Sequence, residues 1–356
     1  MTDAPGSPYG PAQADKERTL FGALADLTRL HYQRCEAYRN IVDALGAPLE
    51  AMRRCEDIPF FPVSLFKDLE LRSIPREEVF KVLTSSGTTG QAVSRMYLDR
   101  ATASAQQKVL AHIVTDFMGA SRLPMLIIDC PSVLTDRNTF SARGAGVLGF
   151  SIFGADRTYA LNDDMSLNRE AVDGFCQRHA GRDTLLFGFT FMIWKHFCQP
   201  LLAGATRPDL SRGVLFHGGG WKKMESEAVT SDIFRQRLAE ACGLRRVHNY
   251  YGMVEQTGSI YVECEQGRLH ASVYSDVIVR RHRDFSCCAA GEPGIIQVLS
   301  ELPRSYPGHS LLTEDQGVLL GEDDCPCGRK GRSFQVLGRL KSAEIRGCSD
   351  TYEQRV

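Results

Sequence analysis

The sequence predicts an α/β protein with packed sheets and flanking helices, and three observations support this fold class. Short apolar runs alternate along the chain with segments whose apolar residues follow helical spacing, which is typical of α/β folds. Two of the runs lead into glycine-rich loops, which suit a backbone that approaches a ligand closely. With 356 residues, the chain can bury a sizeable core in one large domain or in two.

The predicted strands are the short apolar runs. The clearest is "RLPMLIIDCPS" at 122–132, which predicts a buried strand ending at Asp129 and Cys130. Similar runs lie at 184–194, 212–220, 245–253, 269–280 and 292–302. Apolar residues at helical spacing predict helices at 20–45, 101–119 and 231–243. Residues 1–14 are rich in Pro and Gly, and we expect them to be disordered.

The composition argues against several classes of partner and location. The 42 basic and 43 acidic side chains nearly cancel, so no net field favours nucleic acid or an anionic membrane. The sequence contains no run of about 18 apolar residues that would span a bilayer. Its N-terminus lacks the basic start and apolar stretch of a secretory signal, and we expect a cytoplasmic protein. In that setting, the 12 cysteines favour free thiols, a metal site or a catalytic thiol over disulfides.

A loop rich in Ser, Thr and Gly follows the apolar run "VFKVL". This stretch, "LTSSGTTGQAVSR" at 83–95, has no charge before Arg95. Successive backbone N–H groups in such a loop can form an anion-binding nest, although a plain polar loop would use the same residues. It is not a Walker loop, because no Lys follows its last Gly at the required position. A second loop, with Gly218, Gly219 and Gly220, follows the strand predicted at 212–220.

Three later stretches bear on the function of the loop at 83–95. They are "NYYGMVEQTG" at 249–258, "LLTEDQG" at 311–317 and "VLGRLKSAEIRGCSD" at 336–350. In this order they resemble the motifs of adenylate-forming enzymes, the acyl- and aryl-CoA ligase superfamily. Together with "HGGGWKK", "SYPGHSLLTED", "CPCGRKG" and "RGCSDTY", they look most like the LuxE family, the acyl-protein synthetases of the bacterial bioluminescence fatty-acid reductase.

The resemblance covers the chain from about residue 55 and implies its domain organisation. Residues 15–338 correspond to the large N-terminal domain of an adenylate-forming enzyme, with packed mixed sheets and flanking helices. Residues 339–356 correspond to the hinge and a short stub in place of the mobile C-terminal domain. The lysine that superfamily members carry on that domain is therefore absent from its usual place. Lys341, Lys222 or Lys223 could substitute for it.

The resemblance also implies the residues that hold the ATP phosphates and Mg²⁺. The phosphate loop matches Thr84, Ser85, Ser86, Gly87, Thr88, Thr89 and Gly90. Their hydroxyl and N–H groups would donate to the phosphate oxygens, and Arg95 stands near the place of the loop's usual terminal Lys. Glu255 matches the acid that holds Mg²⁺, which needs only one or two protein carboxylates. Val254 replaces the usual Thr, so one α-phosphate contact is in doubt.

Further positions match the adenine and ribose contacts of the superfamily. Tyr251 matches the ring that stacks on adenine, and Asn249 the residue that hydrogen-bonds the adenine amino group. The glycines beside the nucleotide correspond to Gly218, Gly219 and Gly252. Asp315 matches the carboxylate that binds the ribose hydroxyls, and Arg339 the arginine that also reaches the ribose. As alternatives, Asp315 would be a turn residue and Arg339 part of a surface ion pair.

Cysteines supply two further candidate sites. Cys348 lies where the acylated cysteine of the bioluminescence synthetases lies, so it is the expected acyl carrier, since a thiolate is the nucleophile in such chemistry. A buried structural cysteine is the alternative. Cys264, His270, Cys325 and Cys327 suit tetrahedral Zn²⁺, and related phenylacetate-CoA-ligase-like proteins show a similar pattern. Four unligated residues are the alternative there.

The implied function is a two-step reaction that uses ATP and Mg²⁺. A carboxylic acid, in this family a fatty acid, is converted to acyl-AMP, and the acyl group then passes to Cys348 as a thioester. Its further acceptor would be an acyl reductase, an acyltransferase or a carrier protein. One alternative is direct transfer to coenzyme A or to the pantetheine of a carrier protein, with Cys348 incidental. The other is a non-catalytic module that binds nucleotide.

Overall fold

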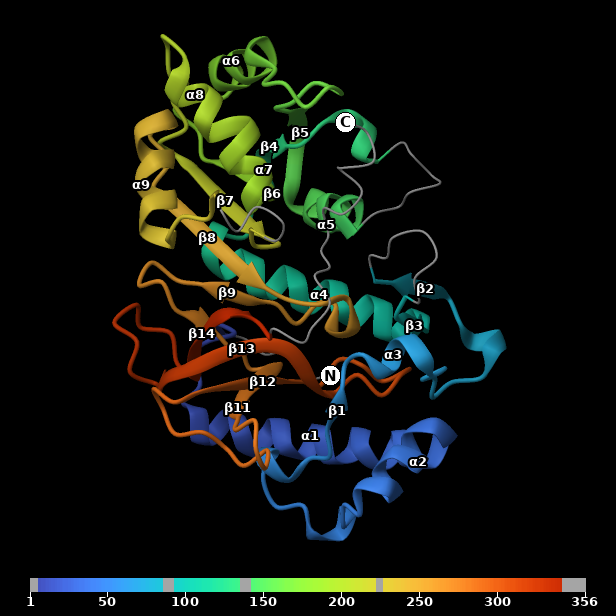
Figure 1. Ribbon diagram of the computed structural model, residues 1–356. Coiled ribbons are helices and arrows are strands. Elements are labelled where there is room, and N and C mark those ends of the chain that lie inside the picture. The colour runs from blue at the N-terminus through green and yellow to red at the C-terminus, as the bar shows by residue number, and fades with distance from the viewer. Residues whose placement is uncertain (1–5, 86–92, 135–141, 222–226, 341–356) are drawn as a thin grey trace. The chain divides into compact units, whose positions relative to one another are not determined.

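The computed structural model describes residues 6–85, 93–134, 142–221 and 227–340 (Figure 1). Its mixed sheets and flanking helices confirm the predicted α/β class. The chain divides into two compact units: unit 1 holds Met1–Phe117 and Gly252–Glu344, and unit 2 holds Met118–Tyr251 and Ile345–Val356. The family resemblance implies one domain over residues 15–338, whereas the contacts divide this range between the two units. None of the described helices is long and apolar enough to cross a membrane.

Unit 1 is built on a mainly antiparallel sheet. Its strands follow the order β11 (Ser275–Arg280), β12 (Pro293–Ser300), β13 (Ser310–Glu322), β14 (Arg332–Arg339), β10 (Leu269–His270) and β9 (Tyr261–Glu263). The short β1 (Phe61–Pro62) pairs with β13 in parallel. A separate antiparallel pair consists of β2 (Lys81–Thr84) and β3 (Arg95–Leu98). The strand predicted at 292–302 is confirmed as β12, whereas the run predicted as one strand at 269–280 forms two, β10 and β11.

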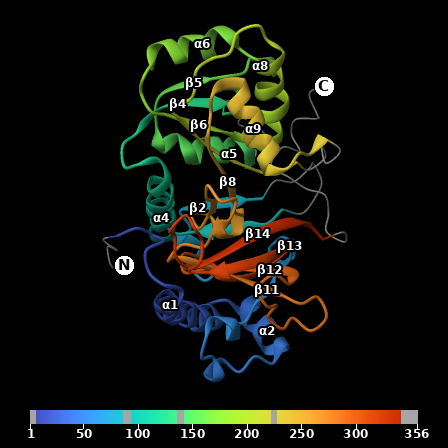
Figure 2. The ribbon, with the colours of Figure 1, turned by 90° about the vertical axis from the view of Figure 1, so that its left-hand side faces the viewer.

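Helices α1 (Gln13–Arg34) and α2 (Glu36–Leu45) cover one face of this sheet (Figures 1 and 2). The helix predicted at 20–45 is interrupted at Cys35, which has an extended backbone. Leu20 and Leu24 of α1 pack with Ile278 and Leu299 of the sheet. The other helical segments of the unit are α3 (Leu65–Asp68), α4 (Arg100–Met118), η1 (Leu49–Ala51), η2 (Cys55–Asp57), η3 (Arg76–Glu78) and η9 (Val254–Gln256).

The expectation that residues 1–14 are disordered is wrong for residues 6–14. Tyr9 is buried, and its carbonyl oxygen accepts a 2.8 Å hydrogen bond from the backbone N–H of Lys330. Helix α1 begins at Gln13, whose backbone N–H donates to the carboxylate of Asp323 at 3.0 Å. The Pro- and Gly-rich composition predicted disorder, but partners distant in sequence satisfy the polar groups of this segment.

Unit 2 is built on a parallel sheet. Its strands follow the order β5 (Gly154–Tyr159), β4 (Leu123–Ile128), β6 (Thr184–Phe189), β7 (Gly213–Gly218) and β8 (Arg246–Tyr251). Four of them confirm the strands predicted at 122–132, 184–194, 212–220 and 245–253. Strands β4, β6 and β7 are buried on both faces, as is usual in a parallel sheet, and are therefore continuous apolar runs.

Helices pack on both faces of the parallel sheet. Phe150 of α5 (Ala142–Phe150) stacks on Phe187 of β6 with ring centroids 4.3 Å apart. Leu186 and Leu215 belong to a core cluster with Phe175 and Leu238, which come from helices. The helical segments of the unit that contribute to this cluster are α6 (Arg169–Arg178), η7 (Ile193–Cys198), α8 (Gln199–Ala203) and α9 (Ser231–Cys242). Shorter segments are η4 (Pro131–Val133), η6 (Ser151–Phe153) and α7 (Thr190–Met192).

His31, buried in α1, gives unit 1 a predicted pH dependence. Its Nδ1 lies 2.7 Å from the Ser73 hydroxyl, and its Nε2 lies 3.0 Å from the carbonyl oxygen of Pro303, so Nε2 is the protonated nitrogen of a neutral ring. Burial lowers the pKa of His31 to about 3, against about 6.5 in an unfolded chain. The unfolded state therefore binds more protons than the folded state between these two values.

The contribution of this neutral ring to the free energy of unfolding is fully present above a pH of about 6.5. It declines as the pH falls toward 3. At pH 5 the loss should be roughly 1–2 kcal/mol. Thermal unfolding followed by circular dichroism between pH 7.5 and 5 should show a flatter decline in His31→Gln than in the wild type. His282→Gln, which replaces an exposed histidine, should keep the wild-type slope. An equal slope in His31→Gln would contradict the prediction.

Candidate functional site

The neck of the Ser/Thr/Gly loop is closed by hydrogen bonds. Thr84 of β2 pairs with Arg95 of β3, so the loop connects two antiparallel strands. The backbone N–H of Ser85 donates to the carbonyl oxygen of Ser94 at 3.1 Å. The backbone N–H of Ser94 donates in return to the Ser85 hydroxyl at 3.0 Å. Five predicted loop residues lie outside the described residues: Ser86, Gly87, Thr88, Thr89 and Gly90.

Glu255 is a buried carboxyl beside this neck. It lies in η9 and is 6% exposed. Burial raises the pKa of its carboxyl, while a hydrogen bond from the Ser94 hydroxyl and the charge of Lys67 lower it. Ser94 thus connects the neck of the loop to the predicted Mg²⁺ ligand. A buried carboxylate with a hydrogen-bond donor and a cation nearby is suited to hold a hard cation between itself and phosphate.

Asp315 and Arg339 lie directly opposite each other on β13 and β14. The Nε of Arg339 is 3.8 Å from Oδ1 of Asp315, and its Nη2 is 3.5 Å from Oε2 of Glu314. Asp315 is part of a strand rather than of a turn. Arg339 does form an ion pair, and its side chain is 41% exposed. The register therefore brings together the two residues predicted to contact the ribose.

In unit 2, the predicted adenine residues follow β7 and occupy β8. Asn249 and Tyr251 are both half-buried and, two residues apart, point to the same face of the strand. The Thr190 hydroxyl donates to the carbonyl oxygen of Gly218 at 3.0 Å. Gly219 has a φ of +84°, and a Cβ there would lie 2.8 Å from Cδ1 of Phe189. Gly252 follows β8 directly in the chain and belongs to unit 1.

Several predicted residues lie outside the described residues. They are the thiol Cys348 and the three lysines Lys222, Lys223 and Lys341. Lys67 of α3, which was not predicted, is the cation whose charge acts on Glu255. Ser94 and Tyr306 were also missed as contacts of Glu255. The motif "SYPGHS" contains Tyr306, but nothing in its sequence indicates which carbonyl the hydroxyl binds.

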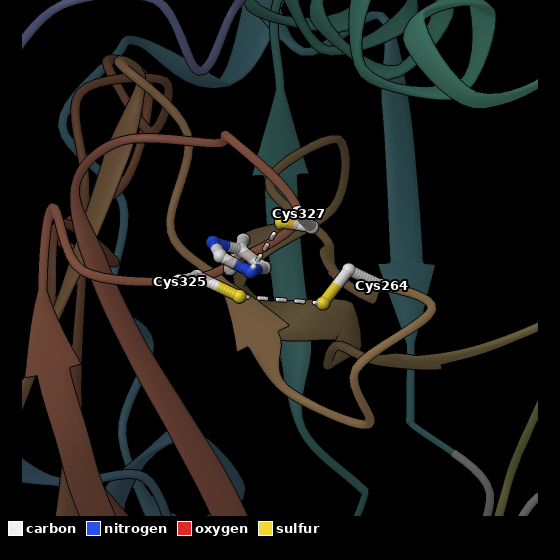
Figure 3. Close-up of side chains that lie close together, drawn as sticks. Cys264, Cys325 and Cys327 are labelled. Atoms are coloured by element: carbon white, nitrogen blue, oxygen red, sulfur yellow. Dashed lines mark hydrogen bonds between the residues drawn. The ribbon is translucent and has the colours of Figure 1, made fainter.

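The four predicted zinc ligands come together in unit 1. Cys264 follows β9, His270 lies on β10, and Cys325 and Cys327 lie in the loop between β13 and β14. Their ligand atoms all lie within 4.8 Å of one another. Figure 3 shows Cys264 and Cys325 with their sulfur atoms facing each other. Cys264, His270 and Cys325 are buried, and Cys327 is half-buried.

The distances within this cluster fit tetrahedral zinc. The Sγ atoms of Cys264 and Cys325 are 3.7 Å apart, and Sγ of Cys327 is 3.5 Å from Nε2 of His270. Zn–S bonds of about 2.3 Å at tetrahedral angles would place two sulfurs about 3.8 Å apart, and a sulfur and a nitrogen about 3.6 Å apart. A three-sulfur, one-nitrogen set with no open position is typical of structural zinc.

A match to a known protein family shows to which family the chain belongs. The family described as "Acyl-protein synthetase, LuxE" matches residues 6–356. The chain belongs to this family. It is therefore an enzyme of the AMP-forming ligase class, and the resemblance seen in its motifs is confirmed.

Two LuxE relatives match nearly the whole chain. Both are named long-chain-fatty-acid--luciferin-component ligase. The Vibrio harveyi protein is 23% identical over 371 residues, which cover 98% of this chain and 91% of that protein. The Aliivibrio fischeri protein is 23% identical over 341 residues, which cover 90% and 84%.

The fold is shared with a solved adenylate-forming enzyme. An open conformation of 2-hydroxyisobutyryl-CoA ligase, in complex with 2-HIB-AMP and CoA, superposes with a TM-score of 0.74 and 16% identity. The match covers 96% of this chain and 75% of that structure. The predicted fold of an adenylate-forming enzyme is therefore confirmed.

The glycine loop after β7 allows a matched test of its packing. Gly219→Ala would place a Cβ 2.8 Å from the Phe189 ring at a φ of +84°, whereas Gly220→Ala, at a φ of +59°, would meet nothing within 4 Å. A left-handed backbone costs alanine about 1–2 kcal/mol at either position, and the clash adds to it only at Gly219. Gly219→Ala should therefore lower the thermal unfolding midpoint more. Equal midpoints would show that Phe189 does not constrain the loop.

Proposed function

We propose that this protein activates a fatty acid with ATP and then carries the acyl group as a thioester on Cys348. The observation that carries the proposal is the Asp315–Arg339 pair in a member of the LuxE family. In such a pair the carboxylate can accept hydrogen bonds from the ribose hydroxyls, and the guanidinium can donate to the ribose oxygens. The names of the two relatives, which refer to a long-chain fatty acid, support the choice of substrate.

In the first step, a carboxylate oxygen of the fatty acid attacks the α-phosphorus of ATP. The bond to the bridging oxygen breaks, and pyrophosphate leaves with the electron pair. Bound Mg²⁺ would neutralise the phosphate charge, and Glu255 would hold it. The loop 84–90 and Lys67 would position the phosphates, since catalysis of phosphoryl-group chemistry is largely positioning and charge stabilisation. Asn249 and Tyr251 would hold the adenine.

In the second step, the Cys348 thiol first loses its proton to solvent, and the thiolate then attacks the acyl carbon of acyl-AMP. The bond from the acyl carbon to the phosphate oxygen breaks, and AMP leaves. The thioester keeps the acyl group activated for a further acceptor. Because the relatives are ligases that act on a luciferin component, we propose an acyl reductase as the partner that receives the group.

The thioester is tested with Cys348→Ser. A serine hydroxyl is far less ionised than a thiol at neutral pH, so this variant should keep ATP–pyrophosphate exchange with fatty acids but lose the acyl adduct seen by intact mass. Hydroxylamine should release the adduct from the wild type. Cys288→Ser, which removes a thiol outside the predicted sites, should keep both properties.

The other possible outcomes of this experiment distinguish the alternative functions. An adduct that persists in Cys348→Ser would move the carrier to another residue. Exchange without any adduct, together with an acyl product only when coenzyme A is added, would favour direct transfer to coenzyme A. Absence of exchange with every fatty acid would favour a non-catalytic nucleotide-binding module.

We also propose that Cys264, His270, Cys325 and Cys327 bind one structural Zn²⁺. The support is the donor set, the tetrahedral distances and the burial of the ligands. Three segments distant in sequence supply the ligands, so the metal would cross-link them. Zinc would supply no step of the reaction in this role.

Elemental analysis of protein purified without chelator should find about one zinc per chain. Cys325→Ser should lose the metal and unfold at a lower temperature, because the binding energy of a structural zinc is folding energy. Cys176→Ser removes a half-buried thiol outside the cluster and should keep the zinc. Wild-type protein without zinc would contradict the proposal.

A further inference from the structure

The loop 305–309 has no role in the reaction as proposed, yet one of its side chains contacts Glu255. Tyr306 is fully buried, and its hydroxyl donates to the carbonyl oxygen of Glu255 at 2.9 Å. The same hydroxyl accepts a 3.3 Å hydrogen bond from the side-chain amide of Gln106 on α4. The Tyr306 hydroxyl therefore donates one hydrogen bond, to the backbone of the predicted Mg²⁺ ligand Glu255, and accepts another from Gln106.

Two glycines show how closely the surrounding segments pack. A Cβ at Gly308 would lie 2.8 Å from the carbonyl oxygen of Glu255. Gly258 has a φ of +92°, and its Cβ would lie 2.6 Å from the carbonyl oxygen of Gln106. Real Cβ atoms do not approach other atoms so closely, so the positions of η9, α4 and the loop 305–309 depend on each other.

The residue that follows Glu255 is also hydrogen-bonded to the loop 305–309. The side-chain amide of Gln256 donates to the carbonyl oxygen of Gly308 at 2.8 Å and to that of Val298 at 3.2 Å. Gln256 is buried, so these bonds exchange little with water. Glu255 is thus held through its backbone by Tyr306 and through its side chain by Ser94.

We propose that Tyr306 is a positioning residue, which orients Glu255 toward Mg²⁺ bound with the ATP phosphates. The inference rests on the proposed function, since it assigns the loop 305–309 a part in the same nucleotide site. Groups that orient a metal ligand without touching the metal typically change metal affinity or activity about 10–100-fold when they are lost. Tyr306 holds the backbone from which the Glu255 carboxylate extends, so loss of its hydroxyl should let that carboxylate shift.

Tyr306→Phe tests this role, because it keeps the ring that packs on Phe66 at a centroid distance of 6.1 Å and removes only the hydroxyl. Its matched control is Tyr261→Phe in the same unit. Tyr261 is also buried, and its hydroxyl donates to the carbonyl oxygen of Asp276 at 2.8 Å. Each variant therefore loses one buried hydroxyl bonded to a backbone carbonyl, and in Tyr306 that carbonyl belongs to Glu255.

The measurement is the binding of ATP by isothermal titration calorimetry, with Mg²⁺ and with EDTA. Tyr306→Phe should weaken binding in Mg²⁺ about tenfold and leave binding in EDTA unchanged, and the half-saturating Mg²⁺ concentration in pyrophosphate exchange should rise. Tyr261→Phe should match the wild type in both assays, whatever its loss of thermal stability. Gln106→Leu, which removes the donor to Tyr306, should shift the Mg²⁺ dependence in the same direction and serves if Tyr306→Phe does not fold.

Two results would overturn the positioning role alone. One is a wild-type Mg²⁺ dependence in folded Tyr306→Phe or in its substitute Gln106→Leu. The other is an equal shift in Tyr261→Phe, which would reveal a general effect of destabilisation. Wild-type protein that does not bind ATP in Mg²⁺ would instead overturn the proposed function and the positioning role together.

Discussion

The antiparallel pairing of β13 with β14 is the constraint on which both candidate sites of unit 1 depend. At one end it places Asp315 opposite Arg339, and at the other its connecting loop carries Cys325 and Cys327. The strand from Asp315 to Glu322 extends for roughly 20 Å at the usual rise per residue. The proposed Zn²⁺ ligands lie beyond the far end of this strand and form a closed donor set, which supports a role in folding.

A buried charge cluster holds the start of β14 in place. Arg332 lies 2.8 Å from Glu322 and 3.0 Å from Glu56, and its Nη1 is 3.6 Å from Asp276. Lys16 of α1 lies 3.2 Å from the same aspartate. Removing Lys16 or Asp276, whose side chains are buried, would leave buried charge uncompensated, which is strongly destabilising. Helix α1 is thereby linked to the hairpin that carries both candidate sites.

Local pattern predicted the strands of unit 2 better than those of unit 1. β4, β6 and β7 are buried on both faces and are therefore uniform apolar runs. β13 was not predicted as a strand, because Thr313, Glu314 and Asp315 interrupt its apolar residues. It continues through them because β12 and β14 supply its hydrogen bonds on both sides. The ordered residues 6–14 were missed for a similar reason, since their partners lie on the distant loop that carries Asp323 and Lys330.

The sequence by itself determined the fold class, the family and the chemical types of the candidate residues, because motifs such as "TSSGTTG" and "NYYGMVEQTG" are contiguous in the chain. Only the tertiary structure decided which atoms meet. Cys264 contacts Cys325 across 61 positions, and Tyr306 reaches the carbonyl oxygen of Glu255 across 51. These contacts depend on strand register and on the close approach that Gly308 permits. Strand register and this close approach are both non-local. A register is set by pairing along whole strands, so no short window of the sequence contains it.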